Sequence, residues 1–167
     1  MQAIIALGSN LGEPEENMRT AARHLRRLSD TPLKLSSIWR TAPVGFKSDV
    51  TEFCNAVVII QTDLNAEVLL DRLQVIERGM GRSQGARAQY SSRTIDLDII
   101  DFGGQDFVST TLRLPHPRAH LRRFVLQPLL EVAPEFRFVN RSESLEELIE
   151  KAPTEPARWS SRLTLSG

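Results

Sequence analysis

Two aspartates one residue apart, Asp96 and Asp98, are the residues of this sequence best suited to chemistry. They lie in a run from Thr94 to Asp101 that alternates apolar and polar residues as a strand does, so both carboxylates should project from one face. Asp is disfavoured in strands, and like charges this close repel unless a cation or several positive groups lie nearby. The spacing therefore predicts a site for a divalent metal ion.

Mg²⁺ is the leading candidate, because it takes oxygen ligands and is commonly held by one or two carboxylates together with substrate phosphates. Calcium fits less well because the oxygen-rich loop that usually binds it is absent, and zinc would need more His or Cys ligands. The alternative without a metal is a pair of surface acids on a half-exposed strand. The two interpretations would be evenly balanced without three arginines just upstream, Arg82, Arg87 and Arg93.

The stretch from Arg72 to Arg93 is rich in arginine and contains a single acid, Glu77. Guanidinium groups bind phosphate bidentately, so this stretch is a candidate anion site. For most of these arginines, exposure on solvated helix faces is the simpler explanation. The formal net charge of the whole chain is +0 at pH 7, which argues against a nucleic-acid partner.

Length and composition predict one domain, spanning residues 1–153, followed by a loose C-terminal tail over 154–167. The 167 residues, 41% of them hydrophobic, can bury one core of useful size. Cys54 is alone, which excludes an internal disulfide and favours a reducing cytosol. No signal peptide or membrane-spanning segment is predicted. We therefore expect a cytoplasmic monomer with no membrane partner.

The order of predicted elements is strand, helix, strand, strand, helix, strand. Their ranges are 3–7, from Pro14 to near Asp30, 33–41, 53–62, from Asp63 or Asn65 to about Met80, and the aspartate strand. This order predicts an α+β, ferredoxin-like (βαββαβ) fold with an antiparallel sheet and helices on one face. The other face should then be covered by loops or used for binding.

Added C-terminal elements should follow the aspartate strand. A short pairing segment is predicted over 107–114 and a helix over 121–131, where Pro128 argues against an unbroken helix. A capping-box pattern, Ser144 to Glu147, predicts a last short helix. Two long connections, 42–52 and 81–92, are of the kind that usually serves a function.

Six ordered blocks of sequence resemble the 6-hydroxymethyl-7,8-dihydropterin pyrophosphokinase family, and together they extend over about residues 2–152. The blocks are Ala6–Gly12, Arg40–Gly45, Phe53–Val57, Ile76-Glu77 with Gly81-Arg82, Arg93–Ile99 and Leu114–Arg118. The pairing of Gly8-Ser9 with two aspartates is also similar to the nucleotidyltransferase pattern. That pattern keeps its two elements close in sequence, whereas here two helices and two strands separate them.

The resemblance implies a folate-pathway enzyme that moves the pyrophosphoryl group of ATP to the hydroxymethyl oxygen of the pterin and releases AMP. It implies that Asp96 and Asp98 hold two Mg²⁺ ions that bridge the phosphates of ATP, the co-substrate. It also implies a phosphate and nucleotide side made of Arg82, Arg93, His116, Arg122, Gln74 and Glu77.

The pterin side implied by the resemblance combines backbone groups, one amide and two rings. The residues are Thr41, Ala42, Val44, Asn55, Phe53 and Phe124. A flat heterocycle needs stacking for affinity and fixed hydrogen-bonding groups for identity. Both phenylalanines could equally be core residues. Asn55 is harder to explain by packing, because a buried amide needs partners, so it is the better-supported pterin contact.

The chain departs from the family pattern just before the aspartate strand. Position 84 is Gln where the family usually has a second Arg, and Gln89–Arg93 replaces a Trp-Gly-Pro-Arg block. Loss of one charge-assisted contact, about 1.5–3 kcal/mol, should weaken ATP binding or slow the reaction without abolishing it. The altered segment keeps two alternatives open: a non-catalytic pterin- or nucleotide-binding relative, and a ferredoxin-like interaction domain.

Overall fold

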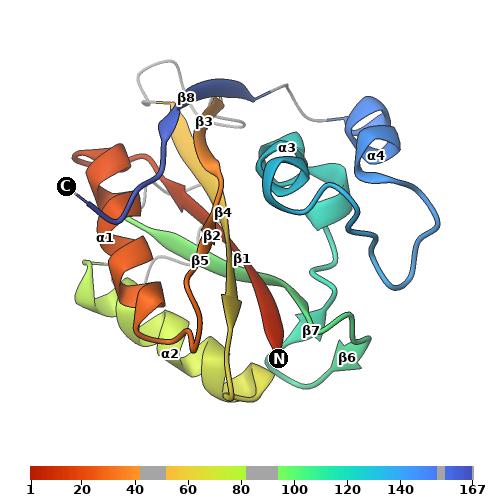
Figure 1. The fold of residues 1–167 in the computed structure, drawn as a ribbon, viewed down its shortest axis with the longest axis horizontal. Coiled ribbons are helices and arrows are strands. Elements are labelled where there is room, and N and C mark those ends of the chain that lie inside the picture. The colour runs from red at the N-terminus through yellow and green to blue at the C-terminus, as the bar shows by residue number, and fades with distance from the viewer. Residues whose placement is uncertain (42–51, 82–93, 154–156, 167) are drawn as a thin grey trace.

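A six-stranded antiparallel sheet with helices packed on both faces is the main layer of the described structure, and a two-stranded sheet lies beside it (Figure 1). The computed structural model describes residues 1–41, 52–81, 94–153 and 157–166. The first elements are β1 (Gln2–Ser9), α1 (Pro14–Arg26), β2 (Lys34–Leu35), β3 (Ser37–Thr41), β4 (Phe53–Gln61), α2 (Ala66–Gly79) and β5 (Asp96–Phe102). The predicted order of strands and helices is therefore confirmed, except that the segment 33–41 forms two short strands.

The C-terminal elements include both of the helices and the hairpin predicted from the sequence. They are β6 (Phe107–Val108), β7 (Arg113–Leu114), a 3₁₀ turn (Ala119–Leu121), α3 (Arg123–Val132), α4 (Leu145–Lys151) and β8 (Arg158–Arg162). Helix α3 continues through Pro128, which is buried. Packing against the core thus outweighs the backbone hydrogen bond that proline cannot donate.

Local capping signals are confirmed in detail. Asn65, rather than Asp63, caps α2, and its side chain accepts a hydrogen bond from Val68 N at 2.9 Å. Ser144 and Glu147 form the predicted capping box of α4. Such caps depend on residues three positions apart, which is why sequence alone locates them.

The main sheet has the strand order β5-β1-β4-β3-β8, and β2 also pairs with β4. All its pairings are antiparallel. Strands β1 and β4 lie at its centre, where β4 is buried along almost its whole length. A strand with a continuous apolar run is typical of a sheet covered on both faces.

The two helices of the predicted βαββαβ core lie on one face of the sheet as predicted, but the added C-terminal helices cover part of the other face, which was expected to carry loops or a binding site. Helices α1 and α2 bury one face, through residues such as Leu25 and Leu69, and we call it the first face. Helices α3 and α4 pack on part of the other, the second face, through residues such as Leu126 and Leu148. These helices leave part of the second face, at the beginning of β5, uncovered. None of the helices described is long and apolar enough to cross a bilayer.

Residues Arg158–Arg162 form an edge strand of the sheet, so the prediction of a loose tail is wrong for this segment. Its side chains are mostly polar, and Trp159 stays 60% exposed instead of docking in the core. A strand without an apolar face lacks the alternation by which strands are predicted. Its partner strand β3, not its own sequence pattern, determines its conformation.

Candidate active site

Asp96 and Asp98 share the second face at the beginning of β5, as the alternation predicts. Leu97 and Ile99, their neighbours along the strand, pack in the core of the first face. Both aspartates are partly exposed. The two carboxylates therefore lie side by side on the part of the second face that the helices leave open.

Small residues of β1 lie beside the two aspartates. Gly8 pairs with Asp96, and Ala6 pairs with Asp98. On its other side Gly8 pairs with Asn55 of β4, so Asp96 and Asn55 lie in one row across the sheet with only a glycine between them. With strands about 4.8 Å apart, the backbones of these two residues are roughly 10 Å from each other. The carboxylates and the amide thus lie on either side of a strip of sheet surface formed by the small residues of β1.

Asn55 and Thr41 form a polar pair on the β4 side of this strip. Both are buried, and Asn55 Nδ2 donates a hydrogen bond of 3.0 Å to Thr41 Oγ1. This contact fixes the amide orientation, because the nitrogen faces Thr41. The oxygen Oδ1 lies toward Gly8, where an added Cβ would approach it to 3.6 Å. The side chain is therefore held in place by its neighbours, as a recognition group must be.

Phe53 and Phe124 are both only partly buried, and neither belongs to the fully buried core. Phe53 is two residues before Asn55 on β4 and therefore shares its face. Phe124 lies in the first turn of α3 and packs against the core of the second face. The Arg122 guanidinium lies over the Phe124 ring, 5.6 Å from its centroid, within cation–π range. Two rings are thus available on the same face as the amide.

His116 stands next to β5, because its backbone N–H donates to Ile100 O at 2.9 Å. Burial, with help from the charges of Arg122 and Arg118, lowers the pKa of His116 to about 4 despite the opposing effect of Asp96. The ring is therefore neutral at pH 7. Nδ1 accepts a hydrogen bond from Arg118 N at 3.1 Å, which leaves the proton on Nε2. Neutral His116 can donate one hydrogen bond to an anion.

The lowered pKa of His116 predicts a loss of stability in acid. The folded protein resists protonation of this ring, whereas the unfolded chain binds the proton near pH 6.5, so stability is full above pH 6.5 and is lost as pH falls toward 4. Between pH 7 and pH 5 this single group should cost about 2 kcal/mol. Urea unfolding of the wild type and His116→Gln at both values measures it. Equal losses in the two proteins would contradict the assignment.

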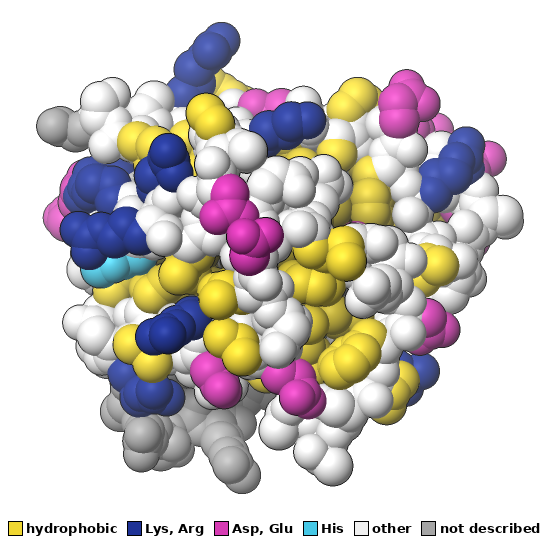
Figure 2. Space-filling view, turned by 60° about the horizontal axis from the view of Figure 1, so that its bottom comes forward, with side chains coloured by type: hydrophobic (Ala, Val, Ile, Leu, Met, Phe, Trp, Pro, Cys, Tyr) yellow, Lys and Arg dark blue, Asp and Glu magenta, His cyan; other side chains and the backbone are white. Residues whose placement is uncertain are grey.

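Lys and Arg side chains gather on one side of the face shown in Figure 2, beside a histidine, while acids are scattered over the rest. The zero net charge of the chain therefore conceals local basic patches. Such patches attract phosphate-bearing ligands over about 10 Å at moderate salt.

Glu77 reaches β5 from helix α2, on the first-face side of the sheet. It is 4% exposed, and its Oε1 accepts a hydrogen bond of 2.8 Å from Leu97 N. Leu97 lies between the two aspartates, so Glu77 supports the strand that carries them. Gln74, on the same helix, is exposed. The predicted contacts of Gln74 and Glu77 with the nucleotide stay predictions.

Replacing Glu77 by leucine should destabilise the protein by about 2 kcal/mol, because the buried Leu97 N–H would lose an acceptor. The same change should lower activity, since the strand between Asp96 and Asp98 is no longer fixed. Glu77→Gln keeps an acceptor oxygen and is the matched control. Chemical unfolding and steady-state rates of the three proteins test this. A leucine variant as stable as the glutamine variant would show that the contact contributes nothing.

Ser9 is a supporting residue that was not among the predicted site residues. It is fully buried at the end of β1, and its Oγ donates to Thr94 O, two residues before β5 begins. Asn17 Nδ2 donates to Ser9 Oγ at 3.2 Å. The sequence signal for this role was a polar residue at the end of a buried apolar strand.

Four predicted site residues, Ala42, Val44, Arg82 and Arg93, lie outside the described residues, as does Gln84.

The two carboxylates of Asp96 and Asp98 fit a metal ion that takes its remaining ligands from water and from a substrate. Within the described part of the chain, no group of three or more His, Cys, Asp or Glu residues could hold a metal ion. Two neighbouring carboxylates are the usual protein ligands of Mg²⁺, which keeps several waters and also binds substrate phosphates.

Known proteins place this chain in a family. The family model of 7,8-dihydro-6-hydroxymethylpterin-pyrophosphokinase matches residues 4–134. The 2-amino-4-hydroxy-6-hydroxymethyldihydropteridine pyrophosphokinase of Haemophilus influenzae is 39% identical over 150 residues, which cover 89% of this chain and 91% of that protein. The enzyme of the same name from Bacillus subtilis is 43% identical over 131 residues, covering 78% and 77%.

A solved structure supports the same placement at the level of the fold. The wild-type HPPK-DHPS of Plasmodium falciparum matches with a TM-score of 0.68 at 15% identity, over 90% of this chain. The chain spans only 43% of that longer protein. Because a family model and close relatives both cover most of its length, the chain belongs to the 7,8-dihydro-6-hydroxymethylpterin-pyrophosphokinase family.

Proposed function

We propose that this protein transfers the pyrophosphoryl group of ATP to the hydroxymethyl oxygen of 6-hydroxymethyl-7,8-dihydropterin, a step of folate biosynthesis. The pterin oxygen attacks the β-phosphorus, the bond from that phosphorus to the α-phosphate oxygen breaks, and AMP leaves. The hydroxyl proton is lost to solvent. The observation that carries the proposal is the row of Asp96, Gly8 and Asn55, which sets a carboxylate pair and a fixed amide on one open face.

Asp96 and Asp98 would hold two Mg²⁺ ions. When bound, these ions supply charge neutralisation on the phosphates of ATP. Neutral His116 would donate a hydrogen bond from Nε2–H to a phosphate oxygen, and Arg122 would add a fixed positive charge beside it. Arg82 and Arg93 would complete the phosphate side, and Gln74 and Glu77 would lie near the nucleotide.

Asn55 would identify the pterin through its amide, which Thr41 holds in place. Phe53 and Phe124 would stack on the two sides of the heterocycle, and Thr41, Ala42 and Val44 would meet its edge through backbone groups. No general base is assigned, because positioning and electrostatic stabilisation can carry phosphoryl-type transfer.

The architecture that supports this site is ferredoxin-like in our proposal. The order β5-β1-β4-β3 and the intervening helices α1 and α2 support that topology, with β8, α3 and α4 as additions. We also propose a cytoplasmic monomer that needs neither nucleic acid nor membrane. The buried, unpaired Cys54 fits a reducing compartment.

Release of AMP from ATP on addition of the pterin, with Mg²⁺ present, tests the reaction. Formation of AMP no faster than background would refute it. Calorimetry distinguishes the alternatives: an enzyme should bind a non-hydrolysable ATP analogue with Mg²⁺ and also the pterin. A non-catalytic relative should bind only one of them, and an interaction domain neither.

A further inference from the structure

The C-terminal strand β8 lies beyond residues 4–134, yet it pairs with β3, the strand that ends at Thr41. Arg40 pairs with Arg158, and Ser37 pairs with Arg162, so the contact extends along β3 from Ser37 to the residue before Thr41. The outer neighbour of the predicted pterin-binding strand is therefore supplied by a segment outside the matched region.

Two consecutive serines of β8 point to the same carboxylate. Ser160 Oγ donates to Glu15 Oε1 at 2.8 Å, and Ser161 Oγ donates to Glu15 Oε2 at 2.9 Å. Neighbouring side chains of a regular strand lie on opposite faces. A register shift between Ile38 and Trp39 leaves Ser160 as an extra residue, and this bulge lets both hydroxyls reach α1.

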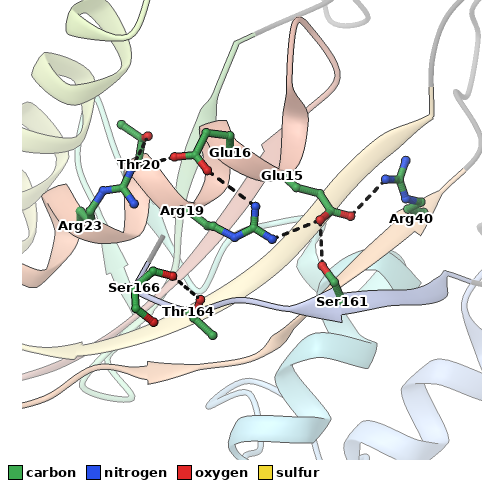
Figure 3. A network of polar contacts seen from close by, with 9 residues as sticks. All are labelled: Glu15, Glu16, Arg19, Thr20, Arg23, Arg40, Ser161, Thr164 and Ser166. Atoms are coloured by element: carbon green, nitrogen blue, oxygen red, sulfur yellow. Dashed lines mark hydrogen bonds and ion pairs between the residues drawn. The ribbon is translucent and has the colours of Figure 1, made fainter.

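Glu15 also holds β3 itself (Figure 3). Arg40 donates to Glu15 Oε1 at 3.1 Å and, through Nε, to Ser160 Oγ at 2.9 Å. Arg19 adds a fourth contact to the carboxylate. Burial alone would raise the pKa of Glu15, but the hydrogen bonds from Ser160, Ser161 and Arg40 lower it. The carboxylate is therefore ionised when it makes these contacts.

Arg40 transmits the restraint to the site because it precedes Thr41. Its side chain lies on the first face with α1, whereas Thr41 faces Asn55. Two further contacts of the same C-terminal segment reach the acceptor side. Arg158 forms an ion pair with Glu52, next to Phe53, and Ala157 N donates to Gln127 on α3, the helix of Phe124.

From these contacts we propose that β8, fastened by Glu15, is a positioning element for the pterin side of the active site. Glu15 touches no reacting group. It holds the end of β3 in the position in which the Thr41 hydroxyl contacts and orients the Asn55 amide. The proposal deepens the proposed function and rests on it.

Glu15→Ala should raise the Kd of the pterin about tenfold, within the range of coupling found for residues without ligand contact. The Kd of a non-hydrolysable ATP analogue with Mg²⁺ should change by less than about twofold, since the carboxylate pair lies on the opposite edge strand. Calorimetry with the two ligands gives both values. Glu15→Gln, which keeps an acceptor oxygen for Arg40 or a serine, should restore most of the pterin affinity.

Glu16→Ala is the matched control. Glu16 lies in the same helical turn, and its ion pairs are with Arg19 and Arg23 of its own helix. Its loss should leave both affinities unchanged. Equal weakening of pterin and ATP-analogue binding in Glu15→Ala, or no weakening of either, would overturn the proposal.

Hydrogen exchange without ligand separates this proposal from the reaction itself. Amides of β3 and the beginning of β4 should exchange faster in Glu15→Ala than in Glu16→Ala. If the wild type bound no pterin, the proposed function would fail while the exchange difference still reported on β8. If pterin bound normally and exchange were equal in the two variants, only the positioning role would fail.

Discussion

Replacing Asp96 or Asp98 by asparagine is expected to lower kcat by about a thousandfold, the upper range for loss of one electrostatic group in an active site. Asparagine keeps the size and one oxygen but removes the charge that holds a cation. Both side chains are partly exposed over small residues, so the sheet should tolerate the change. Rates of AMP formation at saturating ATP and pterin measure the effect.

Binding provides a second readout for the aspartate variants. Each should lose the Mg²⁺-dependent part of ATP-analogue binding while its thermal unfolding stays close to that of the wild type. Asp106→Asn, which changes an exposed acid outside the site, is the control and should retain full activity. Full activity in either Asp96→Asn or Asp98→Asn would remove the metal assignment.

Replacing Asn55 by leucine should separate activity from stability. We expect kcat/KM for the pterin to fall about a hundredfold, because a site built to hydrogen-bond its ligand discriminates strongly when that group is lost. The affinity for the ATP analogue should change little, since β4 lies two strands away from β5. Stability should fall by no more than about 1 kcal/mol, because the lost hydrogen bond to Thr41 is largely offset by a leucine at a position that is 5% exposed in an apolar strand.

Steady-state kinetics and urea unfolding of the Asn55 variant decide between recognition and packing. If the amide served only to hold Thr41, Thr41→Val would reduce pterin turnover as much as Asn55→Leu does. If Asn55 contacts the pterin directly, the threonine variant should lose clearly less. A leucine variant with unchanged kcat/KM would exclude Asn55 from the acceptor site.

The residues of β5 and the helix caps were predictable because their signals are local. Alternation places Asp96 and Asp98 on one face whatever the rest of the chain does. Asn65 and Ser144 are recognised by the residues that follow them within one helical turn. The continuous apolar run of β4 also indicates that both faces of this strand are buried, but it does not show which segment of the chain covers the second face.

The remaining features depend on partners far away in the sequence. Glu77 meets Leu97 across 20 positions, and Ser161 meets Glu15 across 146. Neither contact produces a repeating pattern in the sequence, because a single hydrogen bond constrains only the side chain that makes it. The neutral state of His116 likewise results mainly from burial, which only the folded chain provides.

By itself the sequence determined the order of elements, the shared face of the two aspartates and, through six ordered blocks, the family. Tertiary structure alone decided that helices cover both faces, that Glu77 supports the aspartate strand, and that the C-terminal segment is a strand beside β3. The physical reason is range. Backbone periodicity and caps act within one element, whereas burial, electrostatics and edge pairing depend on which surfaces the whole fold brings together.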